Sequence, residues 1–201
     1  MKKLVSLFLL IMPMSLFSQN IDVDILKKIH SPEPLPSDDF FRFISNSNAY
    51  VFIGTPVTMA VVGLVGHDNE LLGNAAAMAA GTAVAYGVAL GLKYTVKRDR
   101  PFLTYPDDIA NKSGIDWSDS YSFPSGHSTT AFATATALSL DYPKWYVIVP
   151  SYAYAGTVAY SRMHLGVHYP SDVLTGALIG SGCAVLSHFV NKKLQGNSRR
   201  R

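Results

Sequence analysis

Five apolar runs dominate this chain, and they restrict its fold more than any other feature. The longest run, residues 71–92, holds no charged side chain, and the others are 49–66, 128–140, 145–160 and 173–190. A helix needs about 20 predominantly apolar residues to cross a bilayer. Runs of this length that are rich in Ala and Gly favour helices over strands. The sequence therefore predicts an all-α, membrane-embedded bundle of five core spanning helices.

Composition leaves one alternative to this fold open. Charged residues make up 15% of the chain, where about 25% is usual for a soluble domain, but the mean hydropathy of +0.17 is only mildly apolar. Residues 128–140 and 145–160 fall below the lower limit of about 17 residues for a span, and they reach it only if the adjoining polar motifs are included. A water-soluble, all-helical domain with buried helices therefore remains the alternative.

The two ends of the chain predict its domain organisation. Residues 1–18 combine a basic start with an apolar stretch that turns polar at Ser18, which is typical of an export signal or an uncleaved anchor. Residues 19–48 form a polar segment, within which 37–45 predicts a short interfacial helix capped by Ser37. The bundle then occupies 49–191, and a basic cytoplasmic tail occupies 192–201.

Net charge and cysteine content argue against a nucleic-acid partner and an intrachain disulfide bond. The net charge is +3 and the chain has no broad basic face with interleaved aromatic residues, so nucleic acid is not expected as a partner. The single cysteine, Cys183, excludes an intrachain disulfide bond. No obligate protein partner is evident.

Two pairs of glycines, Gly87 with Gly91 and Gly176 with Gly180, allow close contacts between helices.

Three polar clusters flank the apolar runs, at 93–101, 124–127 and 161–172. If the runs thread up and down through a bilayer, all three clusters lie on the same side. Because Lys and Arg favour the cytoplasmic side, the basic tail places the clusters on the opposite face. We therefore expect an inner-membrane protein whose polar site faces the periplasm or the outside.

The first cluster holds two cations, Lys93 and Arg100, followed by Pro101. If the preceding helix continues through this segment, Lys93, Lys97 and Arg100 share one face, and Pro101 ends the helix. Two cations on one face of a helix can hold an anion. A membrane boundary at which long cationic side chains extend towards water is the alternative.

The second cluster is Ser125, Gly126 and His127 at the start of a run of small residues. A serine or glycine at this place predicts a helix start whose free backbone N–H groups suit an anion. Gly126 lets the backbone come close to a ligand, and His127 then lies in the first turn of the helix.

The third cluster combines Arg162, His168 and Asp172. Arg suits phosphate because its planar guanidinium offers several donors, and Asp172 can orient one ring nitrogen of His168. His164 and His168 are four residues apart, which is a spacing of metal ligands, but no third ligand is evident. His30, His67 and His188 are interpreted as surface or boundary residues.

The three clusters resemble, position for position, the tripartite motif of the type 2 phosphatidic acid phosphatase family. This family shares its site with the vanadium haloperoxidases and the bacterial class A acid phosphatases. The resemblance covers residues 93–172 and, through the helical pattern, about 49–191. It implies a metal-independent phosphatase without a cofactor, which acts on a phosphomonoester or diphosphate of a membrane lipid.

The resemblance also implies a role for each residue of the motif. His168 attacks phosphorus and becomes a phosphohistidine, while His127 protonates the leaving group and then activates water. Asp172 orients His168. The phosphate oxygens are held by Lys93, Arg100, Ser125, Gly126 and Arg162, and no metal is expected.

Three other functions remain open. A soluble periplasmic acid phosphatase that acts on small phosphoesters would stay in the aqueous phase without detergent. Known vanadate-dependent haloperoxidases are much longer than this chain. A non-catalytic protein that binds anionic lipid headgroups would need cations, but it would not need His168 with an orienting Asp172.

Overall fold

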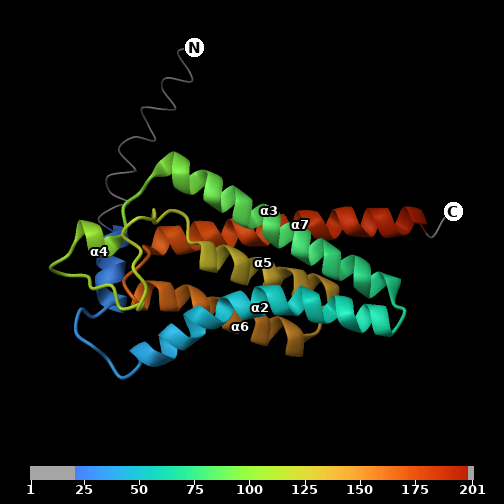
Figure 1. The fold of residues 1–201 in the computed structure, drawn as a ribbon, viewed down its shortest axis with the longest axis horizontal. Coiled ribbons are helices and arrows are strands. Elements are labelled where there is room, and N and C mark those ends of the chain that lie inside the picture. The colour runs from blue at the N-terminus through green and yellow to red at the C-terminus, as the bar shows by residue number, and fades with distance from the viewer. Residues whose placement is uncertain (1–20, 199–201) are drawn as a thin grey trace, which may run out of the picture.

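The computed structural model describes residues 21–198, so the predicted export signal or anchor at 1–18 lies outside the described residues. Figure 1 shows an elongated bundle of long helices. They are α2 (Asp38–Val65), α3 (Asn69–Val96), α5 (Gly126–Asp141), α6 (Trp145–His164) and α7 (Pro170–Ser198), and α4 (Pro101–Thr104) is a short helix between α3 and α5. Residues 21–29 form a further helix. The prediction of an all-α fold is confirmed.

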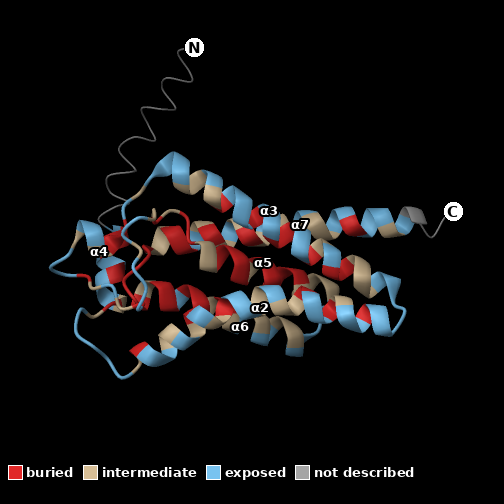
Figure 2. Ribbon diagram, in the orientation of Figure 1, coloured by how far each residue is buried: buried red, intermediate tan, exposed pale blue. Residues whose placement is uncertain are grey.

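The helix α5 lies at the centre of the bundle, and more of its residues are buried than in α2, α3 or α6 (Figure 2). Its buried residues are all Ser, Thr or Ala. Small side chains allow neighbouring helices to approach closely, and the threonine hydroxyls bond within the helix, as Thr134 Oγ1 does to the carbonyl of Thr130 at 3.0 Å. This explains how a run of only 16 residues serves as the core of the bundle.

One of the two glycine pairs makes the close contact that its spacing allows. A Cβ atom added to Gly180 of α7 would overlap the backbone oxygen of Thr129 in α5, and one at Gly176 would meet the carbonyl oxygen of Ser125 at 2.5 Å. Side chains at Gly87 and Gly91 of α3 would instead meet open space. Therefore only the α7 pair sets the distance between two helices.

Three helices of the described residues, α2, α3 and α7, are long and apolar enough to cross a membrane. Their outward faces carry exposed large apolar side chains such as Val61, Tyr86 and Leu178. Exposed apolar surface of this extent is costly in water and favourable in lipid. An apolar outer surface on helices of this length is typical of a membrane protein. The helices α5 and α6 do not combine the length and hydropathy that α2, α3 and α7 have.

The start of α2 differs from the prediction of a separate short helix over 37–45. One continuous helix of 28 residues begins at Asp38, and Ser37 makes no capping hydrogen bond through its side chain. Ser45 and Asn48 are buried, and Asn48 Nδ2 donates to Thr130 Oγ1 of α5 at 2.8 Å. Ser45 and Asn48 thus face the bundle, and the segment is continuous with the rest of α2 and not a separate short helix.

The three polar clusters lie at one end of the bundle, as the threading predicts. Figure 1 shows the C-terminal ends of α3 and α6 and the N-terminal ends of α5 and α7 on the side of the bundle that carries α4. The short connections from α2 to α3 and from α5 to α6 lie at the other end, where Asp68 caps α3 by accepting from the N–H of Glu70 at 2.9 Å.

Candidate active site

A cavity of about 300 Å³ opens at the end of the bundle where the clusters meet. Six of the eight predicted site residues line it: Lys93, Arg100, Gly126, His127, Arg162 and His168. The other two, Ser125 and Asp172, are fully buried and do not line the cavity. Long-range folding thus brings together side chains that are up to 75 residues apart in the sequence, from Lys93 to His168.

Lys93 and Arg100 do not lie on one continuous helix. The helix α3 ends at Val96, and Lys97 adopts a left-handed conformation with φ of 53°. Pro101 is the first residue of α4. This position suits proline, because the first residue of a helix makes no intrahelical hydrogen bond through its N–H and so loses nothing when the N–H is missing. The prediction that the helix continues to Pro101 is therefore wrong, and Arg100 reaches the cavity from an extended segment between two helices.

The first two cations are held by oxygen atoms of the loop before α5. Lys93 Nζ donates to the carbonyl of Tyr121. Arg100 Nε donates to the carbonyl of Ser120 at 2.9 Å, and Nη2 donates to Ser120 Oγ at 2.7 Å. Neutral oxygens orient these side chains without cancelling their charges, so the charges remain available for an anion in the cavity.

Arg162 is a buried cation with unpartnered hydrogen-bond donors. Its side chain is 1% exposed, and Nη1 donates to Ser45 Oγ, but its buried Nε and Nη2 have no hydrogen-bond partner. Within residues 21–198, no carboxylate lies within ion-pair distance of Arg162, Lys93 or Arg100. A buried guanidinium without a counter-ion is costly. The arrangement is therefore suited to an anion that supplies the missing acceptors.

The second cluster forms the N-terminus of α5. Ser125 is its N-cap, and its hydroxyl accepts from the N–H of Ser128 at 3.4 Å. Its own N–H donates to the carbonyl of Asp172 at 3.0 Å, which joins α5 to α7. Gly126 and His127 follow in the first turn and line the cavity. The Ser125 hydroxyl accepts within the first turn of α5 and does not line the cavity, so its contact with phosphate stays a prediction.

His168 lies in the turn between α6 and α7, with its two ring nitrogens in different surroundings. Nε2 is 3.3 Å from Arg100 Nη1, which can only donate, so Nε2 accepts and the proton is assigned to Nδ1. Nδ1 is 3.4 Å from Ser122 Oγ and 3.5 Å from Asp172 Oδ2. Burial, together with the nearby charges of Arg100 and Arg162, lowers the pKa of His168 well below 6.5. A neutral imidazole with an unprotonated Nε2 can act as a nucleophile.

Two residues of the site were missed by the sequence analysis. Trp117 lies over both guanidinium groups, with its ring centroid 4.8 Å from Arg100 Cζ and 5.6 Å from Arg162 Cζ. Ser122 lies between His168 and Asp172 and donates to Asp172 Oδ2. Both belong to the loop between α4 and α5. No local signal marks them, because their partners come from other parts of the chain.

The alternative of a metal site on His164 and His168 finds no support in the geometry. His164 Nε2 is 2.8 Å from Asp38 Oδ1, and Lys112 Nζ is also 2.8 Å from this oxygen. No group of three or more His, Cys, Asp or Glu side chains that could hold a metal occurs in residues 21–198. His164 thus belongs to a network that ties α2 to α6.

The interpretation of His30 as a surface or boundary residue is wrong. His30 is 5% exposed, and its Nδ1 donates to the carbonyl of His164 at 2.8 Å. Its Nε2 accepts from the N–H of Ala110 at 3.1 Å. This neutral form is consistent with burial, which lowers the pKa of His30. His30 therefore connects the N-terminal segment to α6 and to the loop that borders the cavity.

Comparisons with known proteins identify the family of this chain. The family model of the PAP2 superfamily matches residues 74–195. An undecaprenyl-diphosphatase of Sulfolobus acidocaldarius is 32% identical over 173 residues, which cover 84% of this chain and 79% of that protein. A decaprenylphosphoryl-5-phosphoribose phosphatase of Mycobacterium tuberculosis is 39% identical over 104 residues, which cover 51% of this chain and 52% of that protein.

A solved structure has the same arrangement of helices. The transmembrane PAP2 type phosphatidylglycerolphosphate phosphatase from Bacillus subtilis aligns with a TM-score of 0.70 at 25% identity, over 96% of this chain and 98% of that chain. The chain therefore belongs to the PAP2 superfamily. The predicted resemblance is confirmed, and the chain is a hydrolase of the membrane phosphatase class.

Proposed function

We propose that this protein is a metal-independent phosphatase that removes phosphate from a phosphomonoester or diphosphate of a membrane lipid. The observation that carries the proposal is Arg162, a buried guanidinium with unpartnered donors that faces a cavity shared with Lys93 and Arg100. Three cations without carboxylate partners in the described residues match the charge that spreads over the phosphoryl oxygens during transfer.

The geometry supports a two-step reaction through His168. In the first step, Nε2 of His168 attacks phosphorus, and the bond from phosphorus to the leaving oxygen breaks as His127 gives that oxygen a proton. In the second step, His127 takes a proton from water, the water oxygen attacks phosphorus, and the phosphorus–nitrogen bond breaks. Lys93, Arg100 and Arg162 hold the phosphoryl oxygens throughout, and inorganic phosphate leaves.

An apolar groove beside the cavity supports a lipid substrate. The groove lies between α2 and α3 and has a volume of about 770 Å³. It shares Phe52 and Tyr86 with the catalytic cavity, and Ile53, Val57 and Leu72 extend it away from that cavity. A phosphate held by the three cations would therefore place an attached hydrocarbon chain against this apolar surface.

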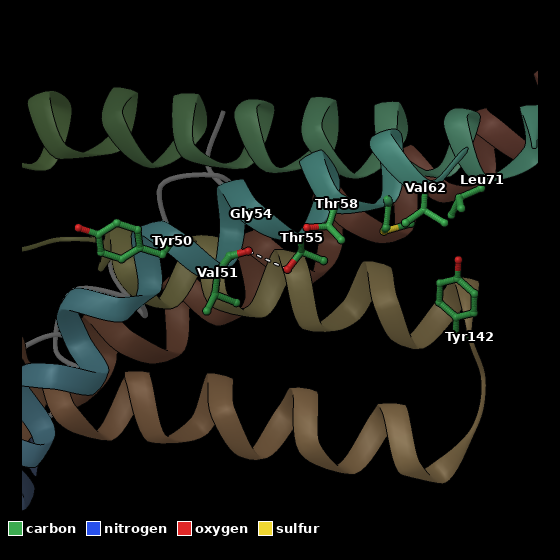
Figure 3. A pocket seen from close by; sticks show the side chains of 9 residues that line it. Tyr50, Val51, Gly54, Thr55, Thr58, Val62, Leu71 and Tyr142 are labelled. Carbon is green, nitrogen blue, oxygen red and sulfur yellow. Dashed lines mark hydrogen bonds between the residues drawn. The ribbon is translucent and has the colours of Figure 1, made fainter. Parts of the chain in front are cut away.

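A second groove, of about 480 Å³, lies on another side of α2 and is lined by Tyr50, Thr55 and Tyr142 among others (Figure 3). It shares no residue with the catalytic cavity. The Thr55 hydroxyl bonds back to the carbonyl of Val51 at 2.7 Å. The substrate chain is therefore assigned to the groove between α2 and α3, and not to the surface in Figure 3.

A panel of substrates with chelator present tests this proposal. We expect the purified protein in detergent to release phosphate from polyprenyl diphosphate or phospholipid phosphate substrates in EDTA, since Lys93, Arg100 and Arg162 supply the positive charge. Vanadate is expected to inhibit, because it adopts the geometry of the phosphoryl group in transfer.

Soluble sugar and nucleotide phosphates serve as the comparison in this panel. Faster turnover of these substrates, by a protein that stays soluble without detergent, would favour the periplasmic acid phosphatase instead. Loss of activity in EDTA that zinc or magnesium restores would refute the metal-independent mechanism.

We further propose that the site faces the periplasm or the outside of an inner membrane, with the tail from 192 in the cytoplasm. The basic residues of the tail support this orientation. In a Cys183→Ser background, we expect Ser118→Cys, in the exposed loop 102–123, to react with a membrane-impermeant thiol reagent in cells with a permeabilised outer membrane. Arg200→Cys is expected to react only after lysis. The reverse pattern of labelling would refute this topology.

A further inference from the structure

The N-terminal helix of residues 21–29 contributes one buried carboxylate to the surroundings of the active site. Asp22 is 5% exposed. Its Oδ1 accepts from the N–H of Ser171 at 2.8 Å, and its Oδ2 accepts from Ser171 Oγ at 2.5 Å and from Arg98 Nη2 at 2.7 Å. Asp22 therefore binds the first turn of α7, next to Asp172, although it lies about 150 residues away in the sequence.

Arg98 lies between two carboxylates. Its Nη2 donates to Asp22, while its Nη1 donates to Asp172 Oδ1 at 2.8 Å and to Ser171 Oγ at 2.7 Å. Its guanidinium also stacks on the ring of Tyr169, 3.7 Å from the centroid. Every orientation of this side chain other than the observed one would break several of these contacts at once. Arg98 is thus held in place from two sides, by Asp22 and by Tyr169.

This arrangement divides the two oxygens of Asp172 between different tasks. Oδ1 is paired with Arg98. Oδ2 accepts from the N–H of Tyr169 at 2.9 Å and from the hydroxyl of Ser122, and it lies 3.5 Å from His168 Nδ1. The position of Oδ2 relative to His168 therefore depends on the position of the Arg98 guanidinium.

We propose that Asp22 is a positioning residue of the active site, which acts through Arg98 on Asp172. The proposal rests on the proposed function, in which Asp172 orients His168. Without the charge of Asp22, Arg98 loses its second partner, and its guanidinium is free to turn both nitrogens towards Asp172. A two-pronged pair of this kind would draw Oδ2 away from Ser122 and His168. The imidazole would then lose the support that directs Nε2 at phosphorus.

A purely structural role for this helix is the competing explanation. Val23 and Leu26 are buried against Ile109 and Tyr169, so the helix also packs through apolar contacts. A residue that only holds the helix in place would change the stability of the protein, but not the turnover of molecules that remain folded. The two explanations therefore differ in kcat per folded enzyme.

The test compares Asp22→Asn with Asp24→Asn, a matched control in which the same change is made on an exposed side chain of the same helix. Positioning residues around a catalytic group are commonly worth about 10- to 100-fold in activity. We expect Asp22→Asn to lower kcat by about tenfold with KM changed less than about twofold, because the cations that bind phosphate are untouched. Rapid-quench measurements should show slower phosphorylation of His168. Asp24→Asn should behave as the wild type.

A double-mutant cycle identifies the route of the effect. If Asp22 acts only through Arg98, Asp22→Asn should lower kcat no further in an Arg98→Ala background. An unchanged kcat in Asp22→Asn, after correction for the folded fraction, would overturn the proposal, and so would independent effects of the two substitutions. A wild-type protein that releases no phosphate from any lipid would instead refute the proposed function.

Discussion

His168→Ala is expected to abolish turnover, by at least about a thousandfold, because the nucleophile that accepts the phosphoryl group is removed. The same substitution should abolish any trapped phosphoenzyme. Lys93, Arg100 and Arg162 remain in place in this variant, so inorganic phosphate is expected to bind and raise the melting temperature of both the variant and the wild type. Rapid-quench labelling with a radioactive aryl phosphate measures the phosphoenzyme, and a thermal shift measures binding.

The control is His67→Asn, which changes an exposed histidine at the other end of the bundle. His67 has φ of 53°, and asparagine tolerates this left-handed conformation. This variant should keep full activity. Acid-labile phosphate that persists in His168→Ala, on His127 or on Ser125, would contradict the assignment of the nucleophile.

The low pKa of His168 adds a check on pH dependence. Burial and the nearby cations favour the neutral imidazole, so His168 in the free enzyme should gain its proton only well below pH 6.5. The NMR titration of labelled histidine, with His168→Ala used to assign the resonance, measures this directly. A titration above pH 6.5 in the free enzyme would show that the cavity lacks the positive field described here.

The fold could be predicted from the sequence because its main signals are local. A run such as 71–92, without charge and rich in alanine, indicates a helix whatever else the chain contains. Threading these runs up and down then brings the three clusters to one end without any knowledge of side-chain contacts. The two Gly-x3-Gly pairs show the limit of such signals: Gly180 contacts α5, whereas Gly87 faces open space, and the spacing is the same in both.

The boundaries of the helices could not be predicted in the same way. The chain around Lys97 contains neither glycine nor asparagine, the usual residues at a left-handed helix end, so nothing local indicates that α3 ends there. Pro101 was predicted to end a helix, but it is the first residue of α4. At the other boundary, Asp38 begins a long helix because it pairs with His164 and Lys112, which are distant in sequence. Helix ends that are set by tertiary partners leave no local pattern.

The same reason explains which site residues the sequence could indicate. Lys93, Arg162 and His168 belong to short motifs of unusual composition. Trp117 and Asp22 lie in segments whose composition is unremarkable, and each gains its place only when the chain folds against it. Asp22 in particular precedes the motif region by about 70 residues, so no spacing rule connects it with Asp172.

His127→Ala is expected to separate the two steps of the reaction. General acid catalysis is worth about 10²- to 10⁴-fold, and most of it is needed when the leaving group is a poor one. A lipid alcohol or phosphate depends on a proton from His127 to leave, whereas an aryl phosphate needs little protonation. We therefore expect the variant to lose lipid turnover while an aryl phosphate still phosphorylates His168.

The phosphoenzyme should then accumulate, because His127 no longer takes a proton from the attacking water. A burst of aryl alcohol close to one equivalent per folded enzyme, followed by slow turnover, would be the kinetic sign, and acid-labile phosphate on His168 would identify the intermediate. A strong amine or imidazole added to the solution should restore part of the second step by replacing the missing base. Equally slow phosphorylation by lipid and aryl substrates, with no burst, would contradict the role of His127, because an aryl leaving group needs little protonation.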